Sequence, residues 1–134
     1  MSSALYWLVL TALMTALFWV PYVLDRIAVL GLVRTMGNPS PKDKPLADWA
    51  QRARAAHTNA VENLAVFGAL AIAAHVAGVG DNPVIAGAAA TYFFARLLHY
   101  LIYTMGIPVA RTLTFALGWA ATVVIGLALI GVIG

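Results

Sequence analysis

Four long apolar segments dominate the sequence, and each is long enough to cross a lipid bilayer as a helix. A membrane-spanning helix needs about 20 mostly apolar residues, so four of them use about 80 residues. The chain has 134 residues, of which 63% are apolar and only 10% are charged. A soluble domain is about half apolar and about a quarter charged. The sequence therefore argues against a soluble or disordered chain and predicts one all-α integral membrane domain over residues 1–134.

The predicted helices cover approximately residues 4–33, 48–77, 84–103 and 109–133. The polar, proline-rich stretch 35–47 predicts a loop, and Asp48 is the expected N-cap of the second helix. Gly78–Pro83 and Met105–Pro108 predict the other two turns. Pro21 lies inside the first apolar segment and predicts a kink or an end of that helix.

The basic residues indicate how the helices are oriented. The connection between the first two helices and the start of the second carry Arg34, Lys42, Lys44, Arg52 and Arg54. Arg111 follows the third connection, whereas the second connection has no Lys or Arg. The positive-inside rule then places the first and third connections in the cytoplasm and both termini on the non-cytoplasmic side. Four spans also require both termini on one side.

Several kinds of chemistry are disfavoured by the composition. The net charge is +3, but the basic residues form no dense tract, so we expect no nucleic-acid partner. Cysteine is absent, which excludes disulfides, thiolate metal sites and a cysteine nucleophile. The three histidines lack short ligand spacing, so we expect no metal site.

The start of the second helix carries a polar stripe. At about 100° per residue, Arg52, Asn59 and Asn63 fall on one face, and Glu62 lies on its flank. This face could form a binding site. Alternatively, the first turns are simply solvated and the arginines anchor the helix at the interface.

The third helix carries a second polar stripe, because Tyr92, Arg96, His99 and Tyr103 are separated by four, three and four residues. Arg96 lies about halfway across the predicted span, where an ionisable group is costly and needs a partner. Glu62 is the natural candidate for that partner. The pair could be part of a site, or it could fix helix packing without chemistry.

Short motifs in the order of the chain resemble those of the MAPEG family, the membrane-associated proteins in eicosanoid and glutathione metabolism, and most closely its bacterial branch. The motifs are Trp19-Val20-Pro21-Tyr22, Gly37-Asn38-Pro39, Ala56-His57-Thr58-Asn59, Glu62-Asn63-Leu64, Phe94-Ala95-Arg96 with His99 and Tyr103, Gly106-Ile107-Pro108 and Arg111-Thr112. The resemblance covers nearly the whole chain.

This resemblance implies a left-handed four-helix bundle that forms a homotrimer in the bacterial inner membrane, with glutathione as co-substrate bound between subunits. Arg111 matches the family arginine that stabilises the glutathione thiolate. The remaining expected binding residues are Arg52, Asn59, Glu62, Arg96, His99 and Tyr103. A lipophilic small-molecule substrate would enter from the membrane lipid.

The sequence departs from the family pattern at Ala55, where glutathione-using members usually carry an arginine. Arg52 shares the helix face and is a possible substitute. The favoured function is a glutathione transferase or peroxidase acting on lipophilic electrophiles or lipid hydroperoxides. The alternative is a non-catalytic protein of the same fold that binds a lipid or another amphiphile. A small proton-coupled exporter is a weaker third hypothesis, since such exporters carry their acidic residue in the first helix, where this chain has only Asp25 towards the end.

Overall fold

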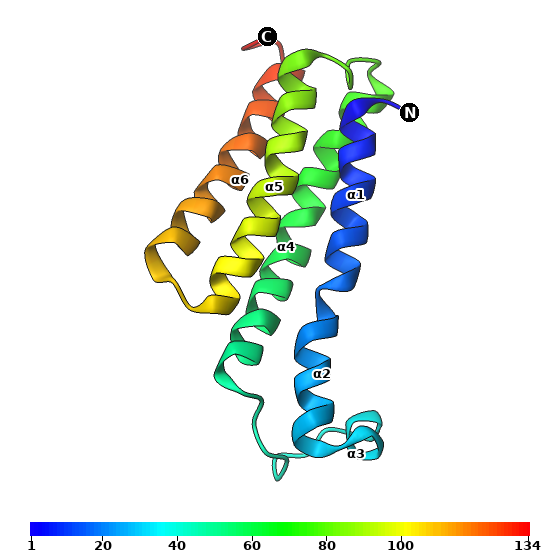
Figure 1. Cartoon of the computed structure of the whole chain (residues 1–134). Helices are drawn as coiled ribbons and strands as arrows, with labels where there is room; N and C mark the ends of the chain where they lie inside the picture. Colours follow the sequence, from blue (N-terminus) through cyan, green and yellow to red (C-terminus); the bar gives the residue numbers. More distant parts are fainter.

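The computed structural model describes all residues 1–134 and contains only helices. Their bounds are α1 Ser3–Leu17, α2 Trp19–Leu30, α3 Leu32–Met36, α4 Asp48–Val76, α5 Pro83–Met105 and α6 Pro108–Leu129. The long helices run up and down the bundle, and both chain termini lie at the same end (Figure 1). The loop that contains α3 and the turn between α5 and α6 lie towards the other end (Figure 1).

Four segments are long and apolar enough to cross a membrane, as the sequence predicts. They are Ser3–Leu30, Asp48–Val76, Pro83–Met105 and Pro108–Leu129. Large apolar side chains such as Leu13, Val66 and Trp119 are exposed on the outside of the bundle, where a bilayer would surround them. The prediction of a four-helix membrane fold is confirmed.

The first span is broken near Pro21, as expected from its proline. α1 ends at Leu17 and α2 begins at Trp19, on either side of Phe18. Pro21 has no N–H to donate to the carbonyl four residues earlier, and its ring crowds that carbonyl. The break is fixed against α5, because Tyr100 donates its hydroxyl to the Phe18 carbonyl at 2.9 Å and stacks on the Phe18 ring.

The predicted continuation of the first helix to residue 33 is wrong, since α2 ends at Leu30. Gly31 has φ 84°, a left-handed conformation that only glycine adopts readily, and the short α3 follows it.

The predicted start of the second long helix also needs a correction. Asp48 is the first helical residue, while Ala47 occupies the N-cap position. The Ala47 N–H instead donates to the Asp25 carboxylate at 2.9 Å.

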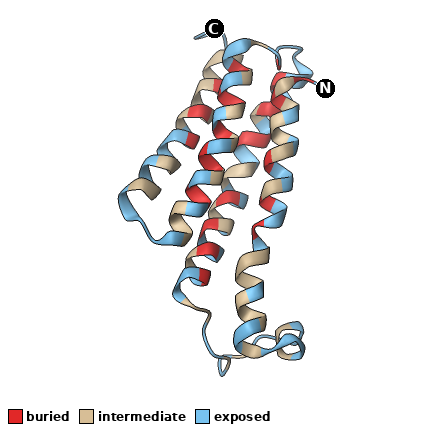
Figure 2. Cartoon of the chain, in the orientation of Figure 1, coloured by how far each residue is buried: buried red, intermediate tan, exposed pale blue.

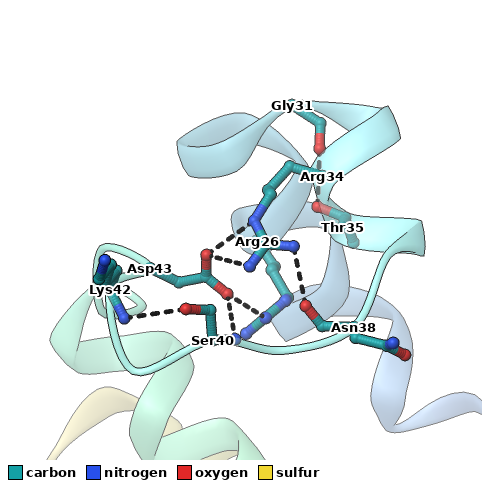
Figure 3. Close-up of polar contacts among 8 residues, drawn as sticks. All are labelled: Arg26, Gly31, Arg34, Thr35, Asn38, Ser40, Lys42 and Asp43. Atoms are coloured by element: carbon teal, nitrogen blue, oxygen red, sulfur yellow. Dashed lines mark hydrogen bonds and ion pairs between the residues drawn. The ribbon is translucent and has the colours of Figure 1, made fainter.

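Asp43 organises the loop between α3 and α4 (Figure 3). Its carboxylate accepts the Ser40 N–H at 2.9 Å and pairs with Arg34 at 2.6 Å and with Arg26 at 3.4 Å. The Ser40 N–H, and after it the Arg34 guanidinium, hold the pKa of Asp43 below its ordinary value. Asp43 therefore stays ionised near neutral pH, and the loop folds back over the end of α2.

The buried positions of α4 recur along the side of the helix that packs in the bundle (Figure 2), and small residues there allow the helices to approach closely. The buried residues of α4 are almost all alanine or glycine: Ala50, Ala53, Ala56, Ala60, Phe67, Gly68, Ala71 and Ala74. The main apolar cluster lies in the half of the bundle near the termini, where Phe67 stacks on Tyr92 of α5. The opposite half has a much smaller core and more polar groups.

The N-terminus is fixed to the turn between α4 and α5. Ser2 lies 3.0 Å from Nδ1 of His75, and the backbone N–H and hydroxyl of Ser3 both donate to Asp81 at 2.7 Å. These bonds from Ser3, its hydroxyl first, hold the pKa of Asp81 below its ordinary value. Gly80 is buried beneath Ser2.

We expect Gly80→Ala to destabilise the protein. A Cβ at this position would overlap with the Ser2 side chain and lie 3.4 Å from the backbone of His75, so the N-terminal segment would have to move. Overpacking of this kind costs about 1–3 kcal/mol. Denaturation of the detergent-solubilised protein measures the change. The matched control is Gly87→Ala, because no atom lies within 4 Å of a Cβ there. Equal stability of the two variants would contradict the prediction.

Candidate functional site

The polar stripe of α5 faces the interior of the bundle, as its spacing predicts. Tyr92, Arg96 and His99 are buried, with exposed fractions of 2%, 2% and 3%. Tyr103, one turn further on, is half-buried. Tyr92 Oη, Arg96 Nε and His99 Nε2 are buried without a hydrogen-bond partner.

Arg96 pairs with Asn59 of α4 rather than with Glu62. Its guanidinium donates to the Asn59 side-chain oxygen, and no carboxylate lies within ion-pair distance. The predicted pairing of Arg96 with Glu62 is wrong. Glu62 is exposed, because three residues rotate it about 60° away from Asn59 around the helix. Arg96 is therefore a buried cation with a neutral partner.

His99 connects α5 to the start of α6. Its Nδ1 lies 3.1 Å from the Arg111 carbonyl, which can only accept, so Nδ1 carries the proton. Thr114 of α6 lies 3.4 Å from the same nitrogen. The His99 ring meets the Tyr103 ring edge to face. These contacts hold the first turn of α6 against α5 and so position Arg111.

Arg111 lies at a cavity of about 190 Å³ between α4, α5 and α6. Its guanidinium lies 4.7 Å from the centre of the Tyr103 ring, and it has no ion-pair or side-chain hydrogen-bond partner. The cavity is lined by Asn59, His99, Tyr103, Arg111, Thr112 and Phe115. A cation held over an aromatic ring and otherwise unpaired is available to an anionic ligand.

A second hollow of about 300 Å³ adjoins this cavity at Tyr103, the one residue that lines both. Arg52 lines it and donates Nε to the Thr104 carbonyl at 3.0 Å, near the C-terminus of α5. Its guanidinium packs against Gly106, where a Cβ would lie 3.1 Å from it. Ala55 and Asp48 also line this hollow.

The structure thus brings together most of the residues expected from the sequence. Asn59, His99, Tyr103 and Arg111 line one cavity, Arg52 lines the adjoining hollow, and Arg96 reaches the cavity through Asn59. Glu62 lines neither space.

The sequence reasoning missed Phe115, Thr112 and Asp48 as lining residues. Phe115 follows Arg111 by four residues, and that spacing is the signal that could have placed it on the same helix face. The sequence predicts Asp48 only as a helix cap. No pattern in the sequence indicates that this end of α4 lies beside Tyr103.

The site can stabilise negative charge. Arg52, Arg96 and Arg111 are three cations with no carboxylate within ion-pair distance. A cation lowers the pKa of a nearby thiol from about 8.5 towards neutrality. No group of three or more His, Asp or Glu side chains could hold a metal ion. These residues suit an anionic ligand.

Fold and site together define a four-helix integral membrane protein with a cationic, aromatic-lined cavity at one end of the bundle. The chain belongs to the MAPEG family, whose sequence model matches residues 3–131. Members of this family are four-helix membrane proteins associated with glutathione-related transferase and isomerase chemistry. Comparison with curated proteins and with solved structures finds no match to this chain.

Proposed function

We propose that the protein is a membrane-bound glutathione transferase or peroxidase that acts on lipophilic electrophiles or lipid hydroperoxides. The observation that carries the proposal is the guanidinium of Arg111, which is unpaired and lies over Tyr103 at the cavity. In this role Arg111 stabilises the thiolate of glutathione. The sulfur then forms a bond to the electrophilic carbon, and the leaving group departs with its electron pair.

The other residues of the proposed site bind and orient the peptide. Arg52 supplies positive charge for its carboxylates, and Asn59 and Tyr103 supply polar contacts. The buried Arg96 acts through Asn59, whose side-chain oxygen it holds. Asp48 lines the second hollow and can accept hydrogen bonds from the ammonium group of the peptide. His99 keeps Arg111 in place through the α6 backbone. In peroxidase chemistry two thiols would be oxidised to a disulfide while a hydroperoxide is reduced to an alcohol and water.

We further propose a homotrimer in a bacterial inner membrane, with glutathione bound between subunits and Glu62 reaching the ligand from its exposed position. Both cavities lie at the surface of the single chain, which supports completion by a neighbouring subunit. Six of the eight Lys and Arg residues lie on α2, α3, the loop after α3 and the first turns of α4. This supports a cytoplasmic location for that end and a non-cytoplasmic one for both termini (Figure 1).

A second candidate function is the binding of a lipid or another amphiphile without glutathione. Ala55 favours it, because this side chain lines the hollow beside Arg52 and supplies no charge there.

Calorimetric titration of the detergent-solubilised protein with glutathione tests the proposal. We expect a saturable heat of binding at millimolar concentrations, together with the ultraviolet absorbance of a thiolate. Native mass spectrometry distinguishes the second candidate, which predicts retained lipid and no bound glutathione. Absence of both the heat and the absorbance would overturn the proposed enzyme.

A further inference from the structure

A second basic cleft lies on a different face of α4 from the proposed glutathione site. It is formed by α2, the loop 37–47 and the first turns of α4, and consists of two adjoining hollows of about 330 and 310 Å³. Four residues line both hollows: Arg26, Pro39, Leu46 and Arg54. Arg54 is rotated by about 200° around α4 from Arg52, so the two arginines serve separate spaces.

The cleft carries more positive than negative charge. Arg26, Lys44 and Arg54 line it, with Asp43 as the only lining carboxylate. Asp43 is already held by Arg34 at 2.6 Å and by the Ser40 N–H, and its distance to Arg26 is the longer 3.4 Å (Figure 3).

Two of the cations that line the cleft have no partner. The side chains of Arg54 and Lys44 make no hydrogen bond or ion pair. The nearby Asp25 carboxylate accepts the Ala47 N–H at 2.9 Å. The unpaired guanidinium of Arg54 on α4 and that of Arg26 on α2, whose ionic contact to Asp43 is 3.4 Å long, therefore line one space that an anion can enter.

We propose that this cleft binds a phosphate group, held between Arg26 and Arg54. Guanidinium groups bind phosphate oxygens through paired, charge-assisted hydrogen bonds. The smaller hollow continues along Tyr22 and Val23, which belong to the membrane span Ser3–Leu30. A phosphate there lies at the edge of the bilayer beside an apolar wall, an arrangement that suits the headgroup of an anionic phospholipid. A soluble phosphate ion would be recognised by the same hydrogen bonds and is the other possible source of the bound phosphate group.

The test compares lipid retention by charge-neutralised variants. Protein is purified from mixed micelles of phosphatidylcholine and phosphatidylglycerol, and native mass spectrometry measures the lipid that stays bound. We expect the unmodified protein to retain phosphatidylglycerol in preference, and Arg54→Gln to weaken this retention about fivefold, since a basic residue near an anionic surface contributes about 1 kcal/mol. Arg54→Gln breaks no contact within the protein. Arg26→Gln should have a similar effect but also removes a contact to Asp43.

Lys42→Gln is the matched control, because Lys42 is exposed, belongs to the same loop and does not line the cleft. It removes the same charge and should leave retention unchanged. Adding inorganic phosphate to the protein in phosphatidylcholine micelles distinguishes a soluble phosphate from a lipid headgroup as the ligand. A rise in melting temperature with phosphate that Arg54→Gln abolishes, without preferential lipid retention, supports the phosphate site and assigns it to a soluble ligand. Equal lipid retention by all variants together with no Arg54-dependent effect of phosphate would overturn the proposal.

Discussion

Arg111→Ala is expected to lower the turnover number for conjugation of glutathione with an aryl halide by about 10²–10³-fold, the usual cost of removing one group that stabilises charge in the transition state. Arg111 is the cation at the cavity that is unpaired and not buried deep in the bundle. Without it the thiol would keep a pKa of about 8.5 and would be mostly protonated at neutral pH. The thiolate absorbance of the bound peptide should disappear in parallel.

Binding should suffer much less than turnover, because Arg52 remains in the adjoining hollow to contact a carboxylate. Steady-state kinetics separate the two effects, since the loss should appear in kcat far more than in KM. Arg111→Lys keeps a positive charge and should recover part of the rate. Arg54→Gln, which removes a cation outside the proposed site, should leave the rate unchanged. A rate for Arg111→Ala equal to that of the unmodified protein would remove Arg111 from the mechanism.

The membrane helices could be predicted from the sequence because the length and apolarity of a segment are properties of the chain itself. The spacing of Tyr92, Arg96 and His99 likewise places them on one face, and all three are buried. The exact ends of the first span depend on local conformation. The left-handed φ of Gly31 ends α2 there, and a preceding apolar run gives no sign of it.

The partner of Arg96 could not be chosen from the sequence. Asn59 and Glu62 both lie within one turn on the same side of α4, and helical spacing cannot tell which of them is turned towards α5. Charge alone favours Glu62, whereas the close packing of Ala53, Ala56 and Ala60 fixes the rotation of the helix. That rotation directs Asn59 to Arg96 and leaves Glu62 exposed.

The proposed phosphate cleft could not be predicted from the sequence. Its residues come from α2, the loop and the start of α4, and they meet only when the loop folds back through Asp43. Basic residues near the end of a span are accounted for by membrane orientation alone, so nothing in their order along the chain indicated that two of them share a cavity.

Ala55→Arg is expected to raise the affinity for glutathione by about 30-fold or more. Ala55 lines the hollow that contains Arg52 and Tyr103, and glutathione-using family members usually have an arginine at this position. Arg52 substitutes only in part, because its Nε is already used by the Thr104 carbonyl and its guanidinium packs against Gly106. One desolvated charge-assisted bond is worth about 2–5 kcal/mol, which sets the lower limit of the expected gain.

Calorimetric titration of the two proteins with glutathione measures the gain. Met36→Arg is the matched control, since Met36 is exposed on α3 and an arginine there adds the same charge far from the hollow. If binding is undetectable in the unmodified protein and appears in Ala55→Arg, the cavity is built for the peptide but lacks one cation, which favours the amphiphile-binding function for the natural chain. If both proteins bind glutathione and Ala55→Arg binds it more tightly, the natural site is functional and Arg52 supplies enough positive charge for binding. An equal dissociation constant for the two proteins would contradict the prediction. It would show that the absence of an arginine at position 55 does not limit the affinity for glutathione.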